Sequence, residues 1–302
     1  MGSIISTTNC PCCGSKSIGK VLACKDYTVS NSMFEVWECE DCTLRFTQNA
    51  PDQDSIGAYY QSDTYISHTD TEKGMVNRIY KQARSYTLNW KMRLLKKGRD
   101  GHLDKGALLD IGSGTGAFLH KAFTAGWEVT GLEPDDGART ICKEKYDIQP
   151  EPPGKLFELS TAKFDVVTMW HVLEHVHELH EYMGEIKRVL KPGGVALIAL
   201  PNYTSKDAMH YAGYWAAYDV PRHLYHFSPK AMRILIEQHA MKLEAVKPMW
   251  LDAFYIALLS EGYKNGKSNL PAALWNGLQS NLHALKDKFS CSSLVYIIHP
   301  AR

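Results

Sequence analysis

Three glycines follow directly on a short apolar run. Residues 107–111 (ALLDI) are apolar except for Asp110, and glycines then stand at alternate positions: Gly112, Gly114 and Gly116. An apolar stretch with helical character comes next, so the pattern predicts a buried strand, a tight turn and a helix start. Because glycine lacks a Cβ, the N–H groups of such a turn can approach a ligand closely. A turn with no ligand is the competing interpretation.

An acidic residue follows the next predicted strand. Residues 127–132 (WEVTGL) read as that strand, and Glu133 stands at its end, seventeen residues after Gly116. A carboxylate there can accept hydrogen bonds from both hydroxyls of an adenosine ribose. The alternative for Glu133 is a solvated loop acid. Together with the glycine turn, this spacing favours a site for an adenosine-bearing ligand.

Histidines and acids cluster in two further stretches that could move a proton. Glu174 and His175 follow the predicted strand 164–169, and a loop rich in aromatic residues carries His223 and His226 close to Asp219. Histidine is suited to proton transfer near neutral pH. We predict that one of His175, His223 and His226 is a general base, with Glu174 or Asp219 orienting it. For each histidine taken singly, packing against the backbone is the competing role.

Two C-x2-C pairs near the N-terminus have the spacing of metal ligands. They are Cys10 with Cys13 and Cys39 with Cys42, and each pair can point two thiolates at one ion from a tight turn. We expect a structural Zn²⁺, because four thiolates leave no open position for chemistry. Disulfide pairing is the alternative. Cys12 lies inside the first turn and could replace a neighbour.

Four stretches of the chain resemble the class I S-adenosylmethionine (SAM) methyltransferases over residues 105–240. The residues D-I-G-S-G-T-G (110–116) resemble motif I of that family, and FDVV, VLEHV and RVLKPGG match its later segments. The segment DVPRHLYHFSP (219–229) resembles the type 23 methyltransferases, and VLEHV also resembles type 11 enzymes that act on quinone precursors. The resemblance implies SAM as the cofactor. It also implies these cofactor-binding residues: Asp110, Gly112, Ser113, Gly114, Thr115, Gly116, Glu133, Pro134, Trp170 and His171.

The resemblance also implies the architecture. We expect an α/β fold with a Rossmann-like, seven-stranded sheet whose last strand, 292–298, is antiparallel. The predicted domains are a zinc ribbon at 1–50, a linker and helical cap at 51–104 (with a helix over 72–97 whose basic outer face is solvated), and a SAM-binding domain at 105–302. Insertions are expected at 201–227 and 250–290. The adenine contact stays open between Glu151 and Glu158.

The acceptor is left open by the sequence. A zinc module before a SAM domain resembles the sugar C-methyltransferases, whereas VLEHV resembles quinone or phenol O-methyltransferases. The alternatives are a ribosomal RNA methyltransferase with a zinc ribbon and a non-catalytic protein that only binds SAM. Substitution of the three histidines would separate a catalyst from such a binding protein.

The composition limits these choices. The chain has 34 basic and 33 acidic residues, so its balanced charge argues against nucleic acid as a partner. We find neither an apolar stretch long enough to span a membrane nor a signal peptide, so we predict a cytoplasmic enzyme with a small-molecule acceptor.

Overall fold

The computed structural model describes residues 3–60, 75–97 and 105–301. Parts of the predicted linker, and the predicted helix start at 72–74, lie outside the described residues. Within the described part of the chain, no helix is both long and apolar enough to cross a bilayer.

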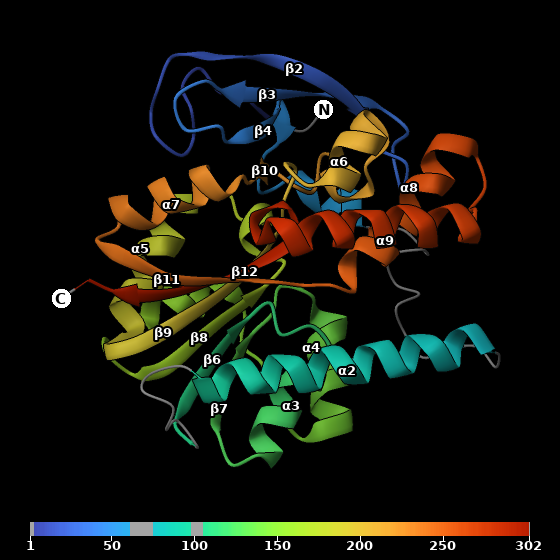
Figure 1. The fold of residues 1–302 in the computed structure, drawn as a ribbon. Coiled ribbons are helices and arrows are strands. Elements are labelled where there is room, and N and C mark those ends of the chain that lie inside the picture. The colour runs from blue at the N-terminus through green and yellow to red at the C-terminus, as the bar shows by residue number, and fades with distance from the viewer. Residues whose placement is uncertain (1–2, 61–74, 98–104, 302) are drawn as a thin grey trace.

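A mixed six-stranded sheet forms the centre of the molecule (Figure 1). Its order is β11-β12-β9-β8-β6-β7. The bounds are β6 Ala107–Ile111, β7 Glu128–Leu132, β8 Phe164–Trp170, β9 Leu190–Pro201, β11 Met241–Pro248 and β12 Ser293–Pro300. Strands β7, β6, β8 and β9 pair in parallel, whereas β12 is antiparallel to both of its neighbours. The predicted α/β fold class and the antiparallel last strand are confirmed.

The sequence also predicts a short strand over 147–149 as a member of the seven-stranded sheet, and that prediction was wrong. Among the described residues, the pairing nearest to this segment is one isolated parallel bridge between Leu132 and Glu151. Asp147 takes a left-handed conformation at the end of the preceding helix, α4 (Asp136–Tyr146). The prolines that follow lack N–H donors, so the chain cannot extend a hydrogen-bonded ladder along β7.

Helices cover both faces of the sheet. Apolar side chains alternate along each strand, so one set (Leu108, Val166, Leu197) packs with α2 (Met75–Lys97) and α3 (Ala117–Thr124). The other set packs with α5 (Leu179–Val189) and α7 (Pro229–Gln238), as Figure 1 shows. Ser228 caps α7 by accepting a hydrogen bond from the Ala231 N–H, with Pro229 in the first turn.

The sequence also predicts a helix that begins at Glu174 and a strand over 195–200, and the structure differs at both places. A 3₁₀ turn, η3 (Leu173–His175), comes first, and α5 begins only at Leu179. Strand β9 also begins earlier than expected, at Leu190, and its register against β8 shifts between Phe164 and Val166. These turns place Glu174 and His175 at the C-terminal end of the sheet, where ligands bind in open α/β folds.

The N-terminal segment forms a second, antiparallel sheet. It contains β2 (Ile18–Lys25), β3 (Met33–Cys39), β4 (Arg45–Gln48) and β10 (Tyr225–His226), while β1 (Ile4–Ile5) pairs separately with β5 (Ala50–Pro51). Strand β10 belongs to the loop 201–227 and pairs with β4. The predicted ribbon at 1–50 is therefore joined to the main domain by a shared sheet.

The predicted insertions cover the sheet end nearest the ribbon. Residues 201–227 form α6 (Lys206–Tyr211) and the 3₁₀ turns η4 (Ala212–Tyr214) and η5 (Ala216–Tyr218), and residues 250–290 form α8 (Asp252–Asn265) and α9 (Leu270–Lys286). Trp215 and Tyr211 are fully buried, and the indole of Trp215 donates to Asp207 at 2.8 Å. Most of the aromatic rings of this loop thus fill the space between ribbon, α8 and α9.

Candidate functional site: a glycine turn beside a buried acid–imidazole network

The turn after β6 requires glycine at two positions. Gly112 and Gly116 have φ angles of 76° and 80°, which L side chains rarely adopt. An added Cβ would lie 2.3 Å from Val172 Cγ2 at Gly112 and 2.1 Å from Cys142 Sγ at Gly116. A Cβ at Gly114 would meet nothing within 4 Å among the described residues. The outer glycines therefore pack tightly, and the middle one is open within the described part of the chain.

Glu133 lies directly beside this turn. Its carboxylate accepts from the Gly114 N–H at 2.7 Å and from the Asp135 N–H at 3.1 Å. Burial raises the pKa of Glu133. The hydroxyl of Ser113 is buried nearby and has no hydrogen-bond partner among the described residues. An open glycine, a neighbouring carboxylate and an unpaired hydroxyl fit the ribose and adjoining groups of an adenosine ligand. Pro134, also predicted to bind cofactor, links Glu133 to Asp135, the N-cap of α4.

A lysine and an aspartate meet behind the turn. Asp110 is fully buried and accepts from the Thr168 hydroxyl at 2.6 Å. Burial raises the pKa of Asp110 to about 7 and lowers that of Lys91, on α2, to about 8. The ammonium of Lys91 lies 4.3 Å from the ring centroid of Trp170. The prediction that basic side chains of this helix are only solvated surface was wrong for Lys91.

His171 lies between two carboxylates. Its Nε2 is 3.1 Å from Asp252 Oδ2, and its Nδ1 is 3.5 Å from Glu174 Oε1. Burial alone lowers the pKa of His171, but the two acids outweigh it and raise the pKa to about 9. At neutral pH the ring is therefore an imidazolium. The residue also has a φ of 59°, a strained conformation of the kind that clusters at functional sites.

Glu174, His175 and His223 form a buried cluster next to His171. Glu174 is fully buried, and among the described residues neither carboxylate oxygen accepts a hydrogen bond, although His171 lies 3.5 Å from one of them. The Nδ1 of His223 donates to the Ala217 carbonyl at 2.9 Å, and the Nδ1 of His175 lies 3.0 Å from the Arg222 carbonyl. Burial lowers the pKa of His175 to about 4, so this ring is neutral at pH 7.

The two histidines of this cluster are held close together. Their ring centroids are 4.5 Å apart, and the Tyr60 hydroxyl lies 3.0 Å from the Nδ1 of His175. One ligand atom from each of Glu174, His175 and His223 lies within 4.8 Å of the others, so a cation is one group that the cluster could hold. The cluster could instead accept a proton from a bound substrate.

His226 does not join this cluster. It lies on β10 in the ribbon sheet, where its Nε2 is 3.3 Å from the Thr47 hydroxyl. Burial lowers its pKa well below the usual value, and its ring centroid is 6.5 Å from that of His223. Asp219, predicted to orient a base, lies 3.9 Å from the Nε2 of His223 and pairs more closely with Arg222, at 2.5 Å. Arg222 also reaches Asp26 of the ribbon at 3.3 Å.

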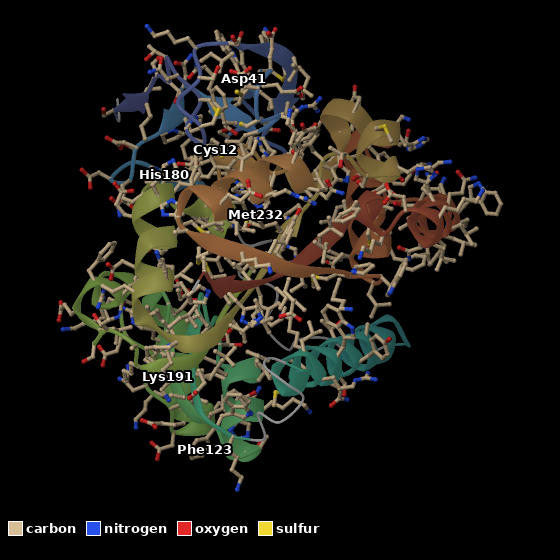
Figure 2. The ribbon with its side chains drawn as sticks, turned by 60° about the vertical axis from the view of Figure 1, so that its left-hand side comes forward. Cys12, Asp41, Phe123, His180, Lys191 and Met232 are labelled. Atoms are coloured by element: carbon tan, nitrogen blue, oxygen red, sulfur yellow. The ribbon has the colours of Figure 1, made fainter. Side chains whose placement is uncertain are left out.

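The four predicted cysteine ligands lie together. Cys10 and Cys42 have their sulfurs 3.4 Å apart, those of Cys13 and Cys39 are 3.6 Å apart, and all four lie within 4.8 Å of one another. A tetrahedral Zn²⁺ with bonds of about 2.3 Å requires S–S distances of about 3.8 Å, which these residues fit. Cys12 lies outside this group of four: its sulfur is 3.8 Å from the Ala231 carbonyl, next to Met232 of α7 (Figure 2), and it also lies beside Cys42.

Comparison with known proteins decides the family. A family model described as "Methyltransferase domain" matches residues 80–244, more than half of the chain. The chain belongs to this methyltransferase family. Its α/β sheet is that of the class I SAM-dependent methyltransferases.

Curated relatives match this methyltransferase over part of their length. A ubiquinone biosynthesis O-methyltransferase of Maricaulis maris is 30% identical over 151 residues, which cover 46% of this chain and 59% of the relative. A probable S-adenosylmethionine-dependent methyltransferase of Mycolicibacterium smegmatis is 32% identical over 97 residues, 32% of this chain and 38% of the relative. The chain thus spans about half the length of these relatives.

Solved structures agree on the fold. Magnesium protoporphyrin IX methyltransferase of Synechocystis, with bound SAH, superposes with a TM-score of 0.53 at 12% identity, covering 83% of this chain and 100% of that one. A putative sarcosine dimethylglycine methyltransferase of Galdieria sulphuraria gives a TM-score of 0.53 at 14% identity, with coverages of 73% and 88%.

Sequence reasoning missed two residues of the methyltransferase's candidate site. Asp252 is 81 positions from His171 and belongs to an insertion, so no local pattern connects them. Lys91 stands beside Trp90 at the edge of the apolar face of α2, which is a weak signal that its side chain points inward.

Proposed function

We propose that this methyltransferase transfers the methyl group of SAM to a small-molecule acceptor. The observation that carries the proposal is the pairing of the open glycine turn and Glu133 with a buried acid–imidazole network at the adjacent strand end. SAM supplies an electrophilic methyl group, and the protein must hold it, align a nucleophile and accept a proton where one is released.

The cofactor-binding residues would divide the work by chemistry. Gly114 leaves room at the turn, Glu133 offers carboxylate oxygens to the ribose, and Ser113 has an unpaired hydroxyl. Asp110 and Lys91 bring one group of each charge to the region beside Trp170, which suits the amino-acid part of SAM. The attraction between Lys91 and Asp110 offsets part of the cost of burying each charge.

The proton acceptor belongs to a continuous network. His223 and His175 pack against Glu174, Glu174 faces His171, and His171 reaches Asp252. We retain His175 and His223 as candidate members of the proton path and regard His226 as a support for the ribbon sheet. Buried ionisable groups with opposed pKa shifts, such as His171 and His175, are typical of sites that move protons.

The acceptor class rests on the relatives and on charge. Curated relatives named as ubiquinone biosynthesis O-methyltransferases favour O-methylation of a small molecule, with sugar C-methylation as the alternative. The balanced charge gives no support to an RNA substrate. The proposal includes a structural Zn²⁺ bound by the four cysteines. It also includes the three-part division into domains and a cytoplasmic location.

The test is cofactor turnover against an acceptor panel. Purified protein is incubated with SAM and a phenol, a catechol, a nucleotide-linked sugar ketone or RNA, and the mass of each product is measured together with the release of S-adenosylhomocysteine (SAH). A gain of one methyl group on a small molecule supports the proposal. Methylated RNA, or cofactor binding with no turnover on any acceptor, contradicts it and favours one of the two alternatives.

A further inference from the structure

Helix α9 presents its large apolar side chains to the outside. Six of them, between 43% and 70% exposed, form what we call the α9 face: Leu270, Leu274, Trp275, Leu278, Leu282 and Leu285. The buried residues of the helix are small instead, namely Ala273, Gly277, Ser280 and Ala284. A surface helix ordinarily turns its large apolar residues towards the core. In α9 that order is inverted, which leaves leucines and a tryptophan exposed.

The contacts on the inner side of α9 fix which side chains point outward. An added Cβ at Gly277 would lie 2.6 Å from the ring of Phe254 on α8, so the two helices approach closely there. The hydroxyl of Ser280 donates to the Asp207 carboxylate of α6 at 2.6 Å. Rotation of α9 about its own axis would break both contacts. The outward direction of the α9 face is therefore set by the packing of the fold.

The α9 face is large enough to take part in a stable protein contact. From their exposed fractions, its six side chains present roughly 600 Å² of apolar surface, the top of the range for the largest patch on a monomer. A standard interface buries about 800 Å² on each partner. The face together with a polar rim would supply that area.

The charge of α9 distinguishes between a membrane and a protein as the partner. The sequence has no lysine, arginine, aspartate or glutamate from Leu270 to Leu285. A helix that lies on a membrane surface carries basic residues beside its apolar face, and these residues do not provide them. Depletion of charge around exposed aromatic and aliphatic side chains is instead typical of the centre of a protein interface.

The spacing of the leucines favours a second copy of this chain as that partner. Leu274 and Leu282 stand four residues to either side of Leu278, so the ridge they form is symmetric about it. In an antiparallel pair with its twofold axis at Leu278, Leu274 of each copy lies opposite Leu282 of the other. A twofold contact uses the same surface on both copies, and an uncharged, symmetric ridge meets that requirement without bringing like charges together.

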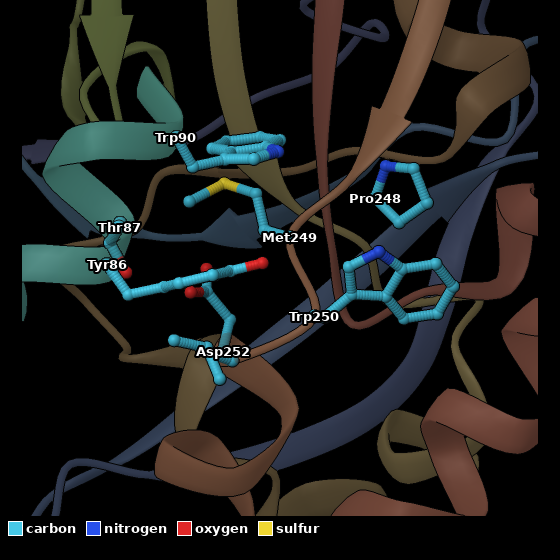
Figure 3. Close-up of a pocket in the computed structure, with 8 residues that line it drawn as sticks. Tyr86, Thr87, Trp90, Pro248, Met249, Trp250 and Asp252 are labelled. Carbon is cyan, nitrogen blue, oxygen red and sulfur yellow. The ribbon is translucent and has the colours of Figure 1, made fainter. Parts of the chain in front are cut away.

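We infer that the α9 face is a homodimer contact, in which two copies pair antiparallel about Leu278. The inference goes beyond methyl transfer and does not depend on it. Pairing would also brace the candidate site, because α9 is tied to the loop that enters α8. Asn281 donates to the Trp250 carbonyl at 2.8 Å, and Asp252 at the start of α8 contacts His171. Figure 3 shows Trp250 and Asp252 at this junction.

The first test is sedimentation velocity over about 1 to 100 µM protein. Wild type should form a species of twice the 34.0 kDa chain mass. Leu278→Glu should weaken the dimer at least about 100-fold, because two carboxylates would then meet at the axis in apolar surroundings. Circular dichroism shows whether the variant is folded. The matched control is Phe123→Glu, at an exposed ring of α3 outside the α9 face (Figure 2), which should dimerise as wild type does.

The second test addresses the antiparallel pairing. Two double variants carry two charges each: Leu274→Lys with Leu282→Glu, and Leu274→Lys with Leu282→Lys. Pairing about Leu278 places opposite charges together in the first and like charges together in the second, so the first should dimerise at least about tenfold more tightly. Equal affinities of the two double variants would overturn the antiparallel arrangement.

The inference as a whole fails if wild type stays monomeric up to about 100 µM. It fails equally if Leu278→Glu, folded as wild type, dimerises with unchanged affinity, because the contact then lies elsewhere. Monomeric wild type that co-sediments with vesicles of phosphatidylcholine and phosphatidylglycerol, while Leu278→Glu does not, would assign the α9 face to a membrane instead. None of these outcomes bears on SAM binding or turnover, so the proposed function is tested separately.

Discussion

The two sides of the candidate site are built in different ways. The proposed cofactor side comes from one continuous stretch, from β6 through Glu133, in which strand, turn, helix and strand follow each other directly. The proposed acceptor side is assembled from separate segments: η3, the loop before β10 and the start of α8. A contiguous site depends on local backbone geometry, whereas an assembled site depends on everything that holds its segments together.

The largest expected effect is at the contiguous side. Gly116→Ala would place a Cβ 2.1 Å from Cys142 Sγ in a residue with φ of 80°. We expect SAH binding to weaken at least about 100-fold, because backbone strain and the clash both displace the turn. Calorimetric titration with SAH measures the loss. Gly154→Ala, where a Cβ meets nothing within 4 Å, is the matched control and should bind normally.

The second effect concerns the four cysteines proposed to bind zinc in the ribbon, which shares a sheet with the loop of the assembled side. Cys39→Ser or a strong chelator should release bound zinc and lower the melting temperature by roughly 10 °C or more, since the ribbon core is too small to fold well without its metal. Metal analysis and thermal unfolding measure both changes. Cys12→Ser keeps all four predicted ligands, so a zinc content as low as that of Cys39→Ser would contradict the ligand set.

A third, intermediate effect tests the ion pairs that link the ribbon to the loop 201–227. Arg222 is 1% exposed and pairs with both Asp26 and Asp219. Asp26→Asn removes one partner of this buried cation, which should cost about 3 kcal/mol of unfolding free energy. Urea unfolding at pH 7 measures the cost. Asp41→Asn, at an exposed acid of the ribbon, should change stability by less than about 0.5 kcal/mol.

The hydrogen bonds to Asp26 also predict that the stability of the fold depends on pH. Burial raises the pKa of Asp26, but hydrogen bonds from Ser30 and Thr28 outweigh it and lower the pKa to about 2. Because this pKa is below its unfolded value of about 3.9, the stabilisation is present above pH 4 and is lost as the pH falls towards 2. The stability difference between wild type and Asp26→Asn should shrink over that window. A constant difference would contradict the assignment.

The contrast explains what could be predicted from the sequence. Gly112, Gly116 and Glu133 act through neighbours that local spacing already specifies, so the turn and its acid could be anticipated. Asp252 could not, because its partner His171 is brought close only by the packing of α8 over the sheet end. His226 resembles His223 in sequence context, and only the pairing of β10 with β4 separates their environments.

The smallest expected effect is that of His226→Gln, and it distinguishes this histidine from His223. His226→Gln should change turnover less than about threefold, since His226 supports the ribbon sheet, whereas His223→Gln should lower it about 100-fold. Steady-state kinetics with SAH binding measured in parallel would show this. Equal losses in the two variants would mean that the acceptor side includes β10.

The central claim is that Glu133 and the glycine turn jointly bind the adenosine part of SAM. Its most direct test is calorimetric titration of SAH into wild type, Glu133→Gln and Glu128→Gln, the last at an exposed acid at the start of β7. We predict micromolar binding to wild type and Glu128→Gln, and binding weakened at least about tenfold in Glu133→Gln. Wild-type protein that binds no SAH, or Glu133→Gln that binds as tightly as wild type, would contradict the account.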